Sequence, residues 1–150
     1  MTKILFFDDE TFISSFIIRN LQDLYGWNSS QEGDIKYVSS VTDLLNEINS
    51  TTIYDLFILD IMTGMPHWQL FPEFTTDELQ RMNNGMNFGI VMAYKIRNIE
   101  KYKSTPIIFL SARNIPNLDM EKIAYLRKPI SANVLDEQMK EFTKQKKANQ

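Results

Sequence analysis

Cysteine is absent from the sequence, and no apolar run approaches the length of a membrane span. The first absence excludes disulfide bonds and thiolate chemistry, and it is compatible with a reducing compartment. At the amino terminus, Lys3 is followed by only four apolar residues before Asp8, which is too short for a signal peptide. We therefore expect a cytoplasmic chain without a membrane segment.

The sequence also lacks a strong excess of charge. Sixteen basic residues against nineteen acidic residues give a net charge of −3, which provides no general attraction for nucleic acids or anionic membranes. The length of 150 residues, with 43% hydrophobic and 23% charged residues, is typical of one soluble domain. We expect a single domain over residues 1–150, with no nucleic-acid-binding module.

The most informative segment is the run of large apolar residues from Leu56 to Leu59, which ends at Asp60. A continuous apolar run of this length predicts a strand that is buried on both faces, as in a parallel sheet. Open α/β sheets bind their ligands at the carboxyl ends of the strands. Asp60 is therefore a candidate functional residue.

Strand and helix patterns alternate along the rest of the chain. Four more strands are predicted at residues 3–7, 35–38, 105–110 and 124–127. Helical spacing with inward-facing apolar residues is found in four segments: Ile13, Phe16, Ile17, Leu21 and Leu24, ending at Gly26; Val41, Leu44, Leu45 and Ile48; Val91, Met92, Ile96 and Ile99, within a helix over Gly89 to Ile99; and Val134, Leu135, Met139 and Phe142, after a capping Ser131. The segment Pro116 to Ile123 has room only for a short helix.

Polar residues follow four of the five predicted strands. Asp8 and Asp9 follow the first, Asp60 ends the third, Ser111 follows the fourth and Lys128 follows the fifth. Right-handed crossovers between parallel strands bring all carboxyl ends to one edge of the sheet, so we expect these side chains to converge.

Three converging carboxylates repel one another unless a cation lies among them. Mg²⁺ suits an all-oxygen ligand set and commonly shares one or two carboxylates with a phosphoryl group. A carboxylate such as Asp60 can act as a nucleophile in phosphoryl transfer, and Lys128 and the Ser111 hydroxyl can stabilise the transferred group. The sequence thus predicts Mg²⁺-assisted phosphoryl transfer.

This set of strand-end residues resembles that of the response-regulator receiver domains, over nearly the whole chain except His67 to Asn87. The resemblance implies an α/β, flavodoxin-like, doubly wound sheet of five parallel strands in the order 2-1-3-4-5. It also implies a phosphorylation-activated switch that receives a phosphoryl group on Asp60 from a histidine kinase or a phosphotransfer protein and acts on a downstream protein target. Its only catalytic activities would be self-phosphorylation from a phosphodonor and autodephosphorylation.

The resemblance assigns the metal ligands. Asp9, Asp60 and the backbone carbonyl of Met62 would bind Mg²⁺, and Asp8 would help to position the metal through a water molecule. The family usually has a proline soon after the acceptor, whereas here Thr63-Gly64-Met65 precedes Pro66.

The resemblance also assigns the residues around the phosphoryl group. Ser111 would hydrogen-bond to it and Lys128 would pair with it, and the Lys128-Pro129 peptide would be cis. Tyr125 falls at the position of the family's switch aromatic residue, which turns inward when Ser111 is drawn to the phosphate. The alternative is an ordinary tyrosine on an amphipathic edge strand.

His67 to Asn87 is too long for a connection between the third strand and the helix that follows, so it is interpreted as an insertion. Thr75 to Glu78 forms a capping-box pattern that predicts a helix over Thr76 to Met82. Its aromatic residues could pack on the nearest helix, or the segment could form a lid hinged at Gly64 and Gly85.

Two other functions remain open. A haloacid-dehalogenase-type phosphatase also uses a strand-end aspartate, a serine or threonine, a lysine and Mg²⁺. The sequence argues against it, because that family needs its nucleophile in the first strand with a second acid two positions later, whereas here Asp8 is followed two positions later by Glu10 and a cap domain of the usual size is lacking. A receiver-like module that is not phosphorylated and acts by partner contact alone is the third reading.

Overall fold

Five parallel strands form one sheet in the order β2-β1-β3-β4-β5. The computed structural model describes residues 2–28, 33–64, 71–114 and 117–148, with side chains up to residue 144. The strands are β1 (Lys3–Phe7), β2 (Asp34–Val38), β3 (Leu56–Asp60), β4 (Ile107–Ser111) and β5 (Ile123–Arg127). The predicted fold class and strand order are confirmed.

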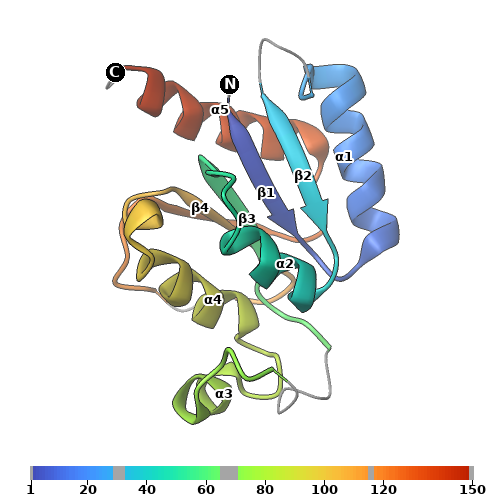
Figure 1. Cartoon of the computed structure of the whole chain (residues 1–150). Helices are drawn as coiled ribbons and strands as arrows, with labels where there is room; N and C mark the ends of the chain where they lie inside the picture. The colour runs from blue at the N-terminus through green and yellow to red at the C-terminus, as the bar shows by residue number, and fades with distance from the viewer. Residues whose placement is uncertain (1, 29–32, 65–70, 115–116, 149–150) are drawn as a thin grey trace.

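Helices cover both faces of the sheet (Figure 1). They are α1 (Thr11–Tyr25), α2 (Val41–Ile48), α3 (Thr76–Met82), α4 (Phe88–Arg97) and α5 (Ala132–Ala148), with a short 3₁₀ helix, η2 (Glu100–Tyr102). Side chains of α2 and α4 pack on one face, and side chains of α1 and α5 pack on the other. Among the described residues, no helix is long and apolar enough to cross a membrane.

β3 is buried on both faces, as its continuous apolar run predicts. Phe57 and Leu59 belong to the core on the α2 and α4 side, whereas Leu56 and Ile58 belong to the core on the α1 and α5 side. Each such side chain contributes roughly 1.5–3 kcal/mol by leaving water, so β3 is held firmly from both sides. Its last residue, Asp60, therefore has a well-defined position.

The prediction of the buried face of α1 is wrong for three residues. Ile13, Phe16 and Leu24 are 55%, 64% and 70% exposed, although Ile17 and Leu21 are buried as expected. The buried stripe of α1 is Ser14, Ile17, Ile18 and Leu21, which has the i, i+3, i+4, i+7 spacing. Two neighbouring apolar stripes share this period, and packing against the sheet selects one of them.

The prediction for α5 is wrong at one position. Leu135, Met139 and Phe142 are buried, but Val134 is 42% exposed. The buried residues follow the i, i+4, i+7 spacing, and Val134 lies one residue to the side of this stripe.

The short helix expected from Pro116 to Ile123 is not found. In the described part of this segment, residues 117–122 contain no helix, and Pro116 lies outside the described residues. Leu118 and Met120 pack against the core instead, and Lys122 turns the chain with a positive φ of 55°. Two apolar residues at a spacing of two do not form one face of a helix, and the described part of this connection is irregular, with bends at residues 119, 121 and 122.

The capping box at the start of α3 is confirmed. The Thr75 hydroxyl accepts from the Glu78 N–H at 3.1 Å, and the Glu78 carboxylate accepts from the Thr75 N–H at 2.9 Å. Asn83 ends the helix in the left-handed region with a φ of 48°.

The described aromatic residues of the β3 to α4 connection pack inward. Phe74 is 5% exposed and lies 6.5 Å from Phe88 at the start of α4, measured between ring centroids. Phe71 packs against the same core. These contacts favour the packing alternative for the aromatic residues, whereas His67 and Trp68 lie outside the described residues.

Candidate functional site

Three aspartates meet at the carboxyl edge of the sheet. β1 and β3 are neighbours with Phe7 opposite Leu59, so the residues that follow, Asp8 and Asp60, come side by side. One carboxylate oxygen from each of Asp8, Asp9 and Asp60 lies within 4.8 Å of the others. Asp8 and Asp60 are only 2% and 3% exposed. The predicted convergence of these acids is therefore found in the structure.

Lys128 completes this acid cluster. Its ammonium nitrogen Nζ lies 2.8 Å from Asp8 Oδ2, 3.4 Å from Asp60 Oδ1 and 3.7 Å from Glu10 Oε1. The backbone N–H of Lys128 donates to the Ser111 carbonyl at 2.8 Å, and the peptide bond to the following proline is cis, as expected. Lys128, which follows β5, thus lies beside Asp8 after β1 and Asp60 at the end of β3.

The cluster strongly perturbs the protonation of Asp60. Burial and the neighbouring charge of Asp8 raise the pKa of the Asp60 carboxyl to about 8, although Lys128 acts in the opposite direction. Burial by itself lowers the pKa of Lys128, but the hydrogen bond to Asp8 and the charge of Asp60 outweigh it, and the pKa is raised.

The residues of the cluster fit a Mg²⁺ ion. All the side-chain donors are carboxylate oxygens, which is the ligand type that Mg²⁺ prefers. A divalent cation among these oxygens would also offset the mutual repulsion that raises the Asp60 pKa. The chemistry of the donor set and its convergence therefore agree with the ion expected from the sequence.

Asp9 is held by residues that the sequence did not single out for this role. The Thr63 hydroxyl donates to Asp9 Oδ2 at 2.9 Å, and the Gly64 N–H donates to the same oxygen at 3.2 Å. The Thr63 N–H in turn donates to the Gly85 carbonyl at 3.0 Å. A threonine soon after Asp60 is visible in the sequence, but its partner Asp9 lies 54 residues away, and no local pattern joins the two.

Gly89 is a second residue that sequence reasoning missed. A Cβ atom at Gly89 would lie 2.5 Å from the Asp60 carbonyl oxygen and 2.7 Å from Ile61 Cα, and both are backbone atoms. The Gly89 N–H donates to the Ile61 carbonyl at 2.9 Å. Glycine is therefore required here for the first turn of α4 to approach the backbone of the proposed acceptor.

Ser111 reaches the same edge from β4 and is 1% exposed. Its hydroxyl accepts from the Arg113 N–H at 3.2 Å, so it is bonded within its own loop. The Arg113 guanidinium donates to the Met86 carbonyl at 2.7 Å and to the Asn87 side chain. The loop after β4 is thereby joined to the residues that precede α4.

Like Ser111, the predicted site residues Tyr125 and Met62 are not members of the acid cluster formed by Asp8, Asp9, Asp60 and Lys128. The Tyr125 ring stacks on Phe109 with a centroid distance of 5.3 Å and an interplanar angle of 21°, and burial raises the pKa of its phenol. Met62 is half-buried and packs against the core on the α2 and α4 side of the sheet. The switch role of Tyr125 and the role of the Met62 carbonyl stay predictions.

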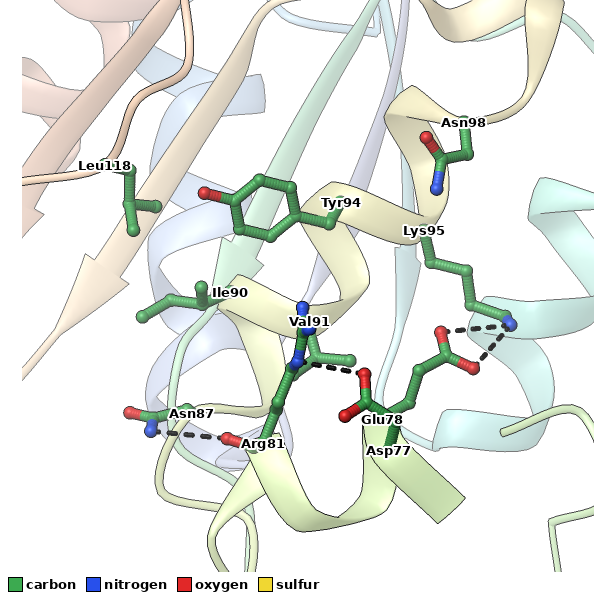
Figure 2. Close-up of a pocket in the computed structure, with 10 residues that line it drawn as sticks. All are labelled: Asp77, Glu78, Arg81, Asn87, Ile90, Val91, Tyr94, Lys95, Asn98 and Leu118. Atoms are coloured by element: carbon green, nitrogen blue, oxygen red, sulfur yellow. Dashed lines mark hydrogen bonds and ion pairs between the residues drawn. The ribbon is translucent and has the colours of Figure 1, made fainter. Parts of the chain in front are cut away.

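A separate hollow of about 440 Å³ lies between α3, α4 and the β4 to β5 connection (Figure 2). An exposed ion pair joins Arg81 to Asp77 at 3.0 Å, and Lys95 lies 3.4 Å from Glu78. The lining residues are Asp77, Glu78, Arg81, Asn87, Ile90, Val91, Tyr94, Lys95, Asn98 and Leu118. Because this lining includes no member of the acid cluster, we place the chemistry at the cluster rather than in the hollow.

No protein-family model and no curated protein sequence matches the chain. Its structure is similar to solved structures at low sequence identity. A chemotaxis protein of Vibrio cholerae is 18% identical with a TM-score of 0.66, and the alignment covers 95% of this chain and 98% of that one. The N-terminal domain of a response regulator/sensory box/GGDEF protein of Carboxydothermus hydrogenoformans is 21% identical with a TM-score of 0.64, covering 99% and 98%.

A response regulator receiver domain protein of Clostridium thermocellum is 22% identical with a TM-score of 0.63, and the alignment covers 100% of both chains. These similarities extend over nearly the whole chain. The chain therefore has the fold of the response-regulator receiver domains.

Proposed function

We propose that this chain is a cytoplasmic, phosphorylation-activated signalling switch that accepts a phosphoryl group on Asp60 from a histidine kinase or a phosphotransfer protein. One observation carries the proposal: the Asp60 carboxylate is nearly buried at the edge of a receiver-type sheet, among Asp8, Asp9 and the ammonium group of Lys128. The fold similarity supports the same function. The signal would then pass to a downstream protein partner.

The transfer is a nucleophilic displacement at phosphorus. A carboxylate oxygen of Asp60 attacks the phosphorus of a phosphohistidine, a P–O bond forms as the P–N bond breaks, and the imidazole leaves with the electron pair. Lys128 Nζ, 3.4 Å from Asp60 Oδ1, is placed to stabilise negative charge on the phosphoryl oxygens. Hydrolysis of the acyl phosphate would return Asp60 to its carboxylate form.

Asp9, Asp60 and the Met62 carbonyl would hold Mg²⁺, with Asp8 acting through water. When bound, Mg²⁺ neutralises charge on the phosphoryl oxygens. Its charge would also favour the ionised, nucleophilic form of Asp60.

Ser111 and Tyr125 would convert phosphorylation into a change of surface. The Ser111 hydroxyl would leave the Arg113 N–H, from which it now accepts at 3.2 Å, and donate to the phosphoryl group. Tyr125 would move with it, at the cost of its stacking on Phe109.

Incubation with acetyl phosphate and Mg²⁺, followed by measurement of the intact mass, tests the proposal. We expect one added phosphoryl group that hydroxylamine removes, because an acyl phosphate is labile to this nucleophile. Asp60→Asn should take up none. Asp23→Asn, which changes an exposed aspartate of α1, is the matched control and should be phosphorylated like the unmodified protein.

Two outcomes would contradict the proposal. No adduct from acetyl phosphate, other small donors or histidine kinases would favour a binding module that is not phosphorylated. Repeated turnover of small phosphomonoesters that Asp8→Asn abolishes and Asp60→Asn retains would favour a phosphatase with Asp8 as its nucleophile.

A further inference from the structure

In the described part of the loop after β3, Thr63 and Gly64 hold Asp9 by hydrogen bonds. Asp9 Oδ2 accepts from the Thr63 hydroxyl at 2.9 Å and from the Gly64 N–H at 3.2 Å. Two donors from adjacent residues thus bind a single carboxylate oxygen. This arrangement restricts rotation of the Asp9 carboxylate.

The loop that carries these donors is itself anchored on its far side. The Thr63 N–H donates to the Gly85 carbonyl at 3.0 Å, and the Thr63 residue is only 5% exposed. Gly85 follows Asn83 and Asn84, and all three have positive φ angles of 91°, 48° and 54° respectively. Figure 1 shows α3, which ends just before this turn, beyond the end of the sheet toward which the strand arrows point. The turn after α3 therefore supports the loop at the acid cluster.

We propose that Thr63 and Gly64 are positioning residues that hold Asp9 in the orientation needed to bind a divalent cation, and that the Gly85 carbonyl fixes their loop. This inference rests on the proposed function, since it takes Asp9 to be a Mg²⁺ ligand. Partners that hydrogen-bond to metal ligands orient them, and their loss typically costs about 10–100-fold in metal affinity. The turn after α3 would then contribute to metal binding without contacting the ion.

The test compares Thr63→Val, which removes the hydroxyl at nearly constant volume, with Thr63→Ser, which keeps it. The Mg²⁺ dissociation constant is measured by titration calorimetry without a phosphodonor. We expect Thr63→Val to weaken Mg²⁺ binding about 10-fold or more and Thr63→Ser to stay close to the unmodified protein.

A kinetic measurement separates positioning from general damage. The rate of adduct formation from acetyl phosphate is measured as a function of Mg²⁺ concentration. In Thr63→Val the rate should be low at limiting Mg²⁺ and should return to the unmodified value at saturating Mg²⁺. A variant with a distorted site would instead stay slow at every concentration.

Gly64 supplies a second, independent pair of variants. Gly64→Ala keeps the N–H, and its Cβ would meet no described atom within 4 Å, so Mg²⁺ binding should be unchanged. Gly64→Pro removes the N–H and should weaken binding severalfold. If Thr63→Val does not fold, this pair decides the test.

Equal Mg²⁺ affinity in Thr63→Val and the unmodified protein would overturn the inference, as would failure of the unmodified protein to bind Mg²⁺. If Thr63→Val does not fold, equal affinity in Gly64→Pro and Gly64→Ala would overturn it in the same way. In these cases phosphorylation of Asp60 could still be observed, and the proposed function would stand. Conversely, Mg²⁺ binding that depends on the Thr63 hydroxyl, in a protein that forms no adduct, would refute the proposed function alone.

Discussion

Two regions of the molecule are held in place by different interactions. The first is the carboxyl ends of β1 and β3, and the second is the connection from β4 to β5. In the first region, Lys128 forms ion pairs with Asp8 and Asp60, and the loop after β3 donates a hydrogen bond to Asp9. In the second, an irregular segment without a helix in its described part packs against the core through the half-buried Leu118 and Met120. All residues of β3 are buried, whereas those of β5 are half-buried or exposed. The comparison predicts that substitutions in the first region change the free energy of unfolding more than substitutions in the second.

Lys128→Met should cause the largest change in the free energy of unfolding. It removes the cation that lies 2.8 Å from Asp8 and 3.4 Å from Asp60 and leaves two nearly buried carboxyl groups without it. Breaking a buried ion pair in this way costs about 3 kcal/mol or more. For a domain of this size, that loss corresponds to a decrease in Tm of roughly 6–12 °C.

Thermal unfolding at neutral pH without Mg²⁺ measures this effect. The control is Arg127→Met, which changes the adjacent basic residue, whose exposed side chain bonds to Asn114. We expect a change below about 0.5 kcal/mol for the control. Similar Tm values for the two variants would show that the acid cluster is no more sensitive than the β5 edge.

Asp60→Asn should have an intermediate effect with a characteristic pH dependence. The Asp60 pKa is about 8 in the folded protein and has an ordinary value of 3.8, so the folded state binds this proton more tightly than the unfolded state does. The stability contributed by the protonated form is fully present below about pH 4 and is lost as the pH rises to about 8. Because Asn cannot ionise, the stability of Asp60→Asn should not fall in this way between about pH 4 and pH 8.

Denaturant unfolding in the presence of a metal chelator checks this prediction. One pKa unit is worth about 1.4 kcal/mol, so at pH 8 we expect Asp60→Asn to be more stable than the unmodified protein by at least that amount. The difference should shrink toward pH 4 and on addition of Mg²⁺. Parallel stability curves from pH 4 to pH 8 would mean that the folded-state pKa of Asp60 is not raised.

Leu118→Ala should have the smallest effect of the three. Leu118 is half-buried in an irregular segment, so its truncation removes only part of a side chain's apolar burial and should cost about 1 kcal/mol. Leu59→Ala, at a fully buried position of β3, is the matched comparison and should cost about 3 kcal/mol or more. Equal losses of unfolding free energy would show that both regions are packed alike.

Features that depend on neighbours in the chain could be predicted from the sequence. The capping box at Thr75 joins residues three positions apart, and the continuous apolar run of β3 identifies a strand buried on both faces. The convergence of Asp8, Asp60 and Lys128 followed from the alternation of strands and helices, because parallel strands place their carboxyl ends at one edge.

Local reasoning gave wrong predictions for the buried face of α1 and for the connection between β4 and β5. In α1, the stripe with Ile13 and Phe16 has the same period as the stripe with Ile17 and Leu21, and only the second faces the sheet. Between β4 and β5, the short span was expected to hold a helix, but its described part has none, and its apolar residues Leu118 and Met120 lie two positions apart, which does not give one helical face.

The sequence by itself determined the order of the elements and the polar residues at the ends of four of the five strands, because both can be read from hydrophobic spacing along the chain. Only the tertiary structure decided which face of α1 is buried and which residues hold Asp9. The Thr63 hydroxyl reaches Asp9 across 54 residues, and its loop is fixed by the Gly85 carbonyl at the turn after α3. Such contacts depend on how separate segments pack in space, and no periodicity within a segment encodes them.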